Sequence, residues 1–155
     1  FDAADVEREV EAQLRQLQGA GLRVDHLNGH QHIHVYGIAG PVIRTAARMG
    51  VRCIRRPADG EFRIPAQSVD VGSMTCPGNF LGAELVGNLD SATLARTLRS
   101  LPDGTTELMV HPGRAERSEG FSGPDREREL AALTDPSMRE ILTGENVRLI
   151  SFAEL

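Results

Sequence analysis

The stretch His26-Leu-Asn-Gly-His-Gln-His-Ile-His34 contains four of the five histidines of this chain, all at even positions. Successive side chains of a strand point to opposite faces, so the sequence predicts a strand with one strongly polar face. We call the polar residues on that face the histidine row: His26, Asn28, His30, His32 and His34. One ion cannot bind the whole row, because a strand rises about 3.3 Å per residue and a metal–imidazole bond is about 2 Å long. Neighbours two apart can bind one ion or substrate while the others support them. A strand of solvated histidines without chemistry is the alternative.

The composition predicts a soluble globular protein. The 155 residues carry a formal net charge of −5, 40% are hydrophobic, and nothing in this balance favours nucleic-acid binding. The sequence contains neither a run of eighteen apolar residues nor a signal-peptide pattern, so we expect a cytoplasmic protein without a membrane span. Cys53 and Cys76 are too few for a disulfide framework and lack zinc-knuckle spacing, and we interpret both as packing residues.

Helical and strand-like stretches alternate along the chain. Apolar residues recur at helical spacing from Val6 to Leu17 and again in the stretch that Pro41 opens, and glycines follow both. Further helices are predicted at 92–101 with Ser91 as the cap, around 127–133 and around 137–142. Strands are predicted at 22–27, 51–54, 105–110 and 147–151, with one more near 69–74 in the otherwise irregular stretch 57–88. This alternation favours βα units and a parallel sheet.

The candidate functional residues follow predicted strands. The histidine row, Arg55 and His111 each lie at or just beyond a strand's C-terminal end, where barrels and doubly wound sheets assemble their active sites. A lone histidine before Pro112-Gly113 is most simply a turn residue. Because His111 and the histidine row both lie at the ends of predicted strands, we instead expect one cleft. The side chains of His111 and His30 would then lie within about 10 Å of each other.

Two motifs and the residue between them resemble the YdjC-like carbohydrate deacetylases, a family that includes chitooligosaccharide deacetylase. The motifs are H-x-N-x-H-x-H-x-H at 26–34 and Thr-Glu-Leu-Met-Val-His-Pro-Gly at 106–113, and Arg55 lies between them. Their order and spacing cover nearly the whole chain. Asn28 stands where many members have aspartate, and the hopanoid-biosynthesis branch resembles this chain in carrying asparagine there. This departure weakens any acid–base role for position 28.

The resemblance implies an α/β fold, namely an incomplete β/α barrel of the glycoside hydrolase/deacetylase type. Residues 1–155 would form a single domain, the C-terminal part of a YdjC-like domain, because such a barrel takes about 250 residues. The family's N-terminal strands, with an aspartate pair and a G-x-H metal histidine, have no counterpart in this sequence. We therefore expect a truncated chain that is inactive by itself.

The resemblance also implies a metal-dependent de-N-acetylase acting on an N-acetylated amino sugar or glycolipid. His30 corresponds to a ligand of a divalent ion, magnesium or zinc; His111 corresponds to the histidine that protonates the leaving amine, and Arg55 to an arginine lining the site. The substrate side of the site would be formed by Asn28, His32 and His34. His26 would lie near the buried start of the strand. The sequence leaves open whether the protein forms a homodimer.

Two other classes of protein remain as alternatives. Another metal-dependent amidohydrolase could also place an H-x-H pair at a strand end, but a metal-bridging lysine or a strand-end aspartate would then be expected. This chain contains no lysine. The second alternative is a non-catalytic remnant that binds a metal ion or a sugar.

Overall fold

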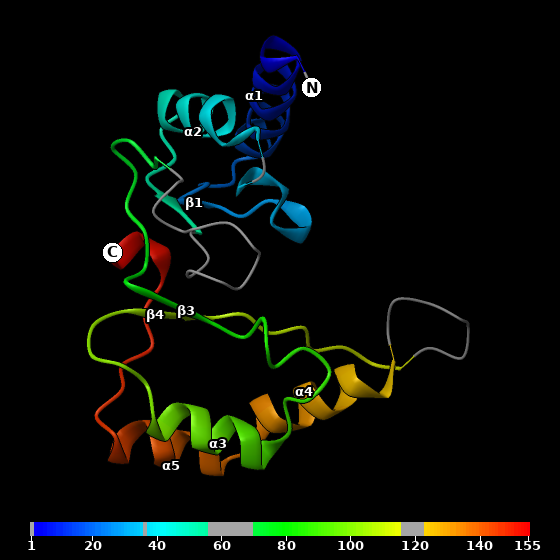
Figure 1. Ribbon diagram of the computed structural model, residues 1–155, viewed down its shortest axis with the longest axis vertical. Helices are drawn as coiled ribbons and strands as arrows, with labels where there is room; N and C mark the ends of the chain where they lie inside the picture. The colour runs from blue at the N-terminus through cyan, green and yellow to red at the C-terminus, as the bar shows by residue number, and fades with distance from the viewer. Residues whose placement is uncertain (1, 36, 56–69, 116–122) are drawn as a thin grey trace. The chain divides into compact units, whose positions relative to one another are not determined.

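The computed structural model describes residues 2–35, 37–55, 70–115 and 123–155 (Figure 1). The chain divides into two compact units, each described by itself below. Unit 1 comprises Phe1–Gly78 together with Ile150–Leu155, and unit 2 comprises Asn79–Leu149. Among the described residues, no helix is both long enough and apolar enough to cross a membrane.

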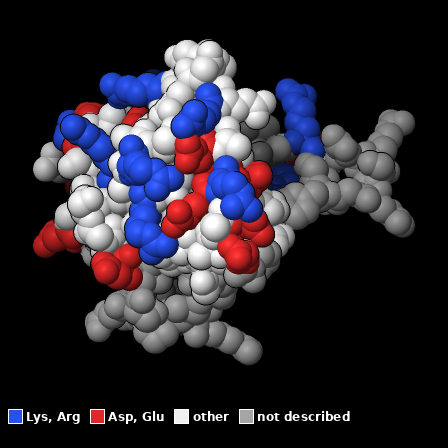
Figure 2. Space-filling view, turned by 90° about the horizontal axis from the view of Figure 1, so that it is seen from above, with Lys and Arg blue, Asp and Glu red and all other residues white. Residues whose placement is uncertain are grey.

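Two helices pack against each other in unit 1. Helix α1 (Ala3–Gly19) begins after Asp2, whose carboxylate accepts a hydrogen bond of 2.7 Å from the amide of Ala4, and α2 spans Ala39–Arg48. The glycines after the two apolar stretches end the helices as predicted. Ion pairs such as Arg44–Glu7, at 2.9 Å, join the two helices. Figure 2 shows basic and acidic side chains interspersed on the face of the molecule in that view. Exposed pairs of this kind contribute about 0–1 kcal/mol each, so apolar packing holds the helices together.

The sheet of unit 1 is short and parallel. Strand β1 (His26–Leu27) pairs with β2 (Cys53–Ile54), and Thr75 forms a parallel bridge to Cys53. The helices and strands enclose one apolar core, whose buried members are Leu14, Ile43, Ala46, Val51, Ile54 and Met74. The pairing of β1 with β2 places the start of the histidine row beside the end of β2.

The predicted strand through the histidine row is wrong beyond Leu27. Residues His30–Val35 form a short 3-10 helical segment, η1, in which Gln31 (φ 48°) and His32 (φ 58°) adopt left-handed backbone conformations. The reason lies in local hydrogen bonding, because the amide of His32 donates to the carbonyl of Gly29 at 2.8 Å and closes a turn. The even-numbered residues therefore do not share one face.

Unit 2 contains a second parallel pair and three helices. Strand β3 (Asn79–Leu81) pairs with β4 (Thr106–Leu108), and helices α3 (Ser91–Arg99), α4 (Pro124–Thr134) and α5 (Ser137–Gly144) lie on one side of the pair in Figure 1. The buried members of the core are Leu89, Leu94, Leu98, Ala132 and Met138. Gly82 (φ 117°) follows β3 so closely beside β4 that a Cβ atom there would overlap the carbonyl oxygen of Met109.

Several element predictions need correction. Strand β3 lies inside the stretch predicted as irregular, whereas 70–74 forms no strand and residue 69 lies outside the described residues. Asp90, rather than Ser91, caps α3, because its carboxylate accepts a hydrogen bond of 2.7 Å from the amide of Thr93. The predicted strand at 147–151 is irregular, and the 3-10 segment η3 (Phe152–Glu154) follows it, with Ser151 and Glu154 forming a capping box. The α/β class and the parallel pairing are confirmed.

Candidate functional site

The end of β2 is tied to the histidine row by the side chain of His34. This imidazole is 1% exposed. Its Nε2 lies 2.9 Å from the carbonyl oxygen of Arg55, and its Nδ1 accepts a hydrogen bond of 3.0 Å from the amide of Gly29. The amide of Arg55 in turn donates to the carbonyl of Leu27 at 3.1 Å. The main chain of Arg55 is therefore fixed on both sides.

These two partners determine the protonation state of His34. A backbone carbonyl only accepts and a backbone amide only donates, so Nε2 must carry the hydrogen and Nδ1 must be bare. This arrangement is the neutral Nε2–H tautomer. Protonation of Nδ1 would remove the acceptor for Gly29, so His34 acts here as a neutral crosslink between two loops. Because both nitrogens bond to main chain, the geometry favours this structural role over the predicted substrate contact.

His32 is also buried, at 7% exposure, and its ring centroid lies 6.4 Å from that of His34. Burial, with a smaller contribution from the nearby charge of Arg55, lowers the pKa of His32 to about 4. His32 is therefore neutral at pH 7. Its left-handed backbone is of the kind that clusters at functional sites, where surrounding structure holds a residue in a costly conformation.

Two members of the histidine row near η1 are exposed. Asn28 lies just before this segment, and His30 lies at its start. An ion or a substrate can reach both side chains. Within the described ranges, however, no three His, Cys, Asp or Glu side chains are grouped so that they could hold a metal ion. A catalytic ion typically has about three protein ligands, so the described residues do not fit a complete metal centre, and we derive no catalytic step through an ion. The assignment of His30 as one ligand stays a prediction.

The predicted burial of His26 is wrong, because its side chain is 41% exposed. Its ring stacks on Phe152 with centroids 4.0 Å apart and planes 10° from parallel. Its Nδ1 lies 2.9 Å from Asp25 Oδ1, and this hydrogen bond holds the pKa of Asp25 below its ordinary value. His26 therefore attaches the last residues of the chain to β1.

The end of β4 in unit 2 is held by α4. The amide of His111 donates to Glu129 Oε2, and Arg126 Nη1 donates to the carbonyl of His111 at 3.2 Å. Further along the loop, the amide of Gly113 donates to the carbonyl of Arg126 at 3.1 Å. The side chain of His111 is half-buried. Both main-chain polar groups of His111 are thus fixed by side chains of one helix.

Sequence reasoning missed Glu129. Helix α4 carries three acidic residues, and the spacing of its apolar residues is too irregular to show which of them is buried. Glu129 is 2% exposed, and burial raises the pKa of its carboxyl group.

The structure joins some of the predicted site residues and leaves others apart. In unit 1, His34 contacts Arg55, and His32 lies beside both. His30 and Arg55 belong to unit 1 and His111 to unit 2, so the expected distance between His30 and His111 stays a prediction.

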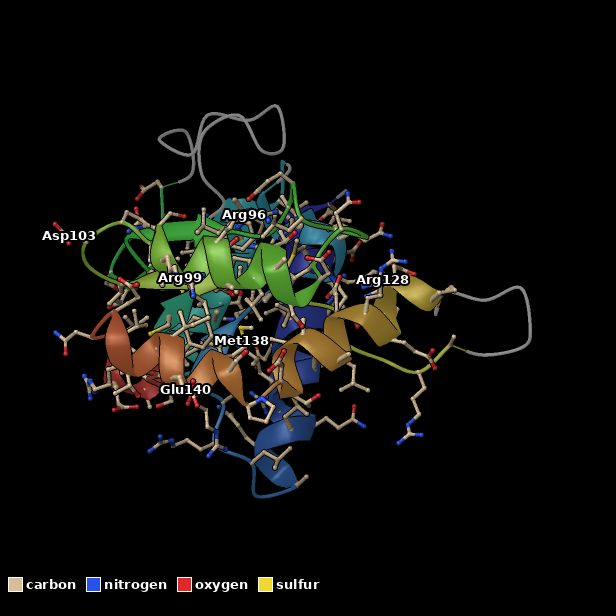
Figure 3. The ribbon with its side chains drawn as sticks, turned by 90° about the horizontal axis from the view of Figure 1, so that it is seen from below. Arg96, Arg99, Asp103, Arg128, Met138 and Glu140 are labelled. Atoms are coloured by element: carbon tan, nitrogen blue, oxygen red, sulfur yellow. The ribbon has the colours of Figure 1, made fainter. Side chains whose placement is uncertain are left out.

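A groove of about 540 Å³ lies between α3 and α5 in unit 2. Figure 3 shows Arg99 and Glu140 on these helices, with Met138 between them. None of the described residues that line the groove is a predicted site residue. The candidate site therefore lies at the strand ends and not in this groove.

Parallel βα pairs with chemistry-bearing residues at their strand ends define a class of α/β proteins with strand-end sites. Within that class, the sequence profile described as "YdjC-like protein" matches residues 1–144, and the chain belongs to this family.

Curated relatives of the chain are named carbohydrate deacetylases. One from Geobacillus stearothermophilus is 31% identical over 97% of this chain and 59% of its own length. A mouse protein of that name is 30% identical over 97% of this chain and 62% of its own length, and one from Brevibacillus brevis is 25% identical over 97% and 61%. The chain thus spans about three fifths of the relatives it matches.

A solved structure shows the same fold. It is that of a candidate cellobiose-phosphate cleavage protein from Enterococcus faecalis, with a TM-score of 0.78 at 18% identity. The match covers 99% of this chain and 61% of that protein. At this identity the likeness concerns the fold alone.

Proposed function

We propose that this chain supplies strand-end groups of a carbohydrate deacetylase that hydrolyses the N-acetyl group of an amino sugar. The observation that carries the proposal is the match of curated carbohydrate deacetylases over 97% of the chain. In the reaction, the oxygen of water bonds to the acetyl carbon, the carbon–nitrogen bond breaks, and acetate and a free amine leave.

His111 is proposed as the general acid. The departing nitrogen needs a proton, and an imidazolium can donate it because imidazoles titrate near neutrality. Acid catalysis of this kind is worth about 10²- to 10⁴-fold in rate. The position of His111 just after β4, with its main chain fixed by α4, supports this role.

Arg55 is proposed to stabilise negative charge on the acetyl oxygen. A guanidinium presents several N–H donors in a planar fork, and it can donate to an oxyanion as charge develops. Its main chain is held at the end of β2 by Leu27 and His34. The side chain is half-buried, at the position where strand-end sites place their polar groups.

We also propose that His30 contributes one ligand to a divalent ion, magnesium or zinc, with the remaining ligands outside the described residues. Exposure of His30 at the start of η1 supports this assignment. Metal content measured by mass spectrometry tests it without an activity assay. His30→Ala should reduce the bound metal at least tenfold, and unchanged metal content would contradict the assignment.

The function is tested by acetate release from N-acetylglucosamine oligomers, using the protein expressed from its complete reading frame. We expect the wild type to release acetate, and we expect this rate to fall at least 100-fold in His111→Asn and in Arg55→Met. Absence of acetate release with added magnesium or zinc would contradict the proposal and favour a binding remnant.

Together with this function we propose three finer points, on the substrate, the location and the fold. The substrate extends to N-acetylated glycolipids, the protein is cytoplasmic, and the two parallel strand pairs belong to an incomplete β/α barrel. Light scattering on the purified protein measures whether it is a homodimer.

A further inference from the structure

Glu129 is a buried carboxylate that the proposed chemistry does not use. It lies on the same face of α4 as Ala132, and the two are 2% and 0% exposed. Burying a carboxylate is costly unless it is hydrogen-bonded, and the direction of its pKa shift shows that the cost is present. A buried group of this kind indicates either a structural bond or a functional one.

The hydrogen-bond partner of the Glu129 side chain is a main-chain amide. It accepts a hydrogen bond from the amide of His111. Arg128, labelled in Figure 3 on the same helix, donates to the carbonyl of Gly87 at 2.9 Å. Helix α4 thus holds the loop after β4 through the buried Glu129 and the loop before α3 through Arg128.

We propose that Glu129 is a positioning residue for His111, a proposal that rests on the proposed role of His111 as the general acid. The amide and the carbonyl of His111 are both fixed, by Glu129 and by Arg126. Fixing the peptide groups on both sides of Cα fixes the direction in which Cβ leaves the main chain and so the base from which the ring is placed. Glu129 therefore acts through the main chain of His111.

The proposal predicts a loss of rate without loss of binding. General acid catalysis requires the proton donor within about 2.6–3.2 Å of its acceptor, and a displacement of about 1 Å can cost about 100-fold. A loop that has lost one anchor samples such displacements. We therefore expect kcat to fall about 10- to 100-fold while KM changes less than threefold.

The test compares Glu129→Gln with Glu140→Gln, the same chemical change at an exposed position of α5. Gln keeps the volume of Glu, but it replaces one carboxylate oxygen with an NH2 group that can only donate, and its remaining oxygen is uncharged and accepts the hydrogen bond of the His111 amide more weakly than a carboxylate does. Because Gln also removes a buried charge, the variant should fold. Glu140→Gln should keep kcat within twofold. In Glu129→Gln, the pH values at which kcat declines on the acidic and basic sides should stay the same, while the maximal kcat between them should fall.

A second readout separates this proposal from the proposed function. Amide hydrogen exchange of His111, measured by NMR, should be slow in the wild type and at least tenfold faster in Glu129→Asp, whose shorter side chain withdraws the carboxylate. If the wild type releases acetate, His111→Asn does not, and Glu129→Gln keeps full kcat, the positioning role is wrong while the function stands. If no acetate is released at all, the function fails, and unchanged exchange in Glu129→Asp overturns the anchor itself.

Discussion

Two strand ends in this chain solve the same problem with different chemistry. After β2, the main chain of Arg55 is held by His34, a neutral side chain that uses one nitrogen as donor and the other as acceptor. After β4, the main chain of His111 is held by Glu129, which can only accept when ionised, and Arg126 supplies the complementary donor. The neutral crosslink connects a donor to an acceptor by itself, whereas the carboxylate needs a second residue for the carbonyl.

A buried ionisable residue need not take part in chemistry directly. The hydrogen bonds of the His34 and Glu129 side chains described above go to main-chain groups. Each side chain comes from a different element than the strand it serves, η1 for Arg55 and α4 for His111. Strand ends that carry function are loops, and loops need such anchors to hold a side chain in one place.

Removing His34 should have the largest effect on stability. In His34→Ala, the amide of Gly29 loses its acceptor, the carbonyl of Arg55 loses its donor, and a cavity replaces a fully buried ring. Two lost buried hydrogen bonds and a cavity together cost about 3–4 kcal/mol in free energy of unfolding. Urea denaturation measures it. The matched control is His30→Ala at an exposed position, which should change stability by less than about 0.5 kcal/mol; equal losses in both variants would break the distinction.

The close approach of Gly29 to His34 offers the next largest effect. A Cβ atom at position 29 would lie 2.6 Å from His34 Nδ1 and 3.0 Å from the amide nitrogen of His34. We expect Gly29→Ala to destabilise unit 1 by about 1–3 kcal/mol, as overpacking does.

Gly19 provides the control for this substitution. A Cβ atom at Gly19, the last residue of α1, meets no atom within 4 Å. Gly19→Ala should be neutral or stabilising by up to about 1 kcal/mol, because alanine restricts the unfolded chain. Thermal unfolding of both variants checks the pair, and equal melting temperatures would contradict the crowding at Gly29.

The smallest effect concerns pH and the other strand end. Burial raises the folded pKa of Glu129 above its ordinary 4.5, so between these two values the folded state binds more protons than the unfolded state. The stabilising contribution of Glu129 is therefore complete below pH 4.5 and is lost as the pH rises through the folded pKa. We expect the stability of the wild type relative to Glu129→Gln to decrease from pH 4 to pH 7. Chemical denaturation at both values measures this difference, and a relative stability that increases with pH would contradict the direction of the shift.

The sequence predicted the helices better than the strands. Apolar spacing and glycine stops located α1 and α2 closely, because a helix makes its hydrogen bonds within its own segment. Strand β3 escaped notice because Asn79–Leu81 is three residues long and takes its pairing from β4, 27 residues further along. The histidine row kept its alternation in sequence but not in space, because Gly29 allowed the chain to turn back onto His34.

The candidate site shows the same limit. His34 was visible because histidines are rare in this chain and four of the five stand together. Its role as a neutral crosslink was not visible in the sequence, because this role depends on which main-chain atoms lie around the ring. Glu129 was invisible because acidic residues are common on helices, and only the packing of α4 shows which one is buried.

Each strand end is held by its own buried side chain, His34 at β2 and Glu129 at β4. Amide hydrogen exchange followed by NMR in the wild type, His34→Ala and Glu129→Asp tests it most directly. We predict slow exchange at Gly29 and His111 in the wild type, with Gly29 alone accelerated at least tenfold in His34→Ala and His111 alone accelerated in Glu129→Asp. Rapid exchange of both amides in the wild type, or acceleration of neither amide in the variants, would contradict the account.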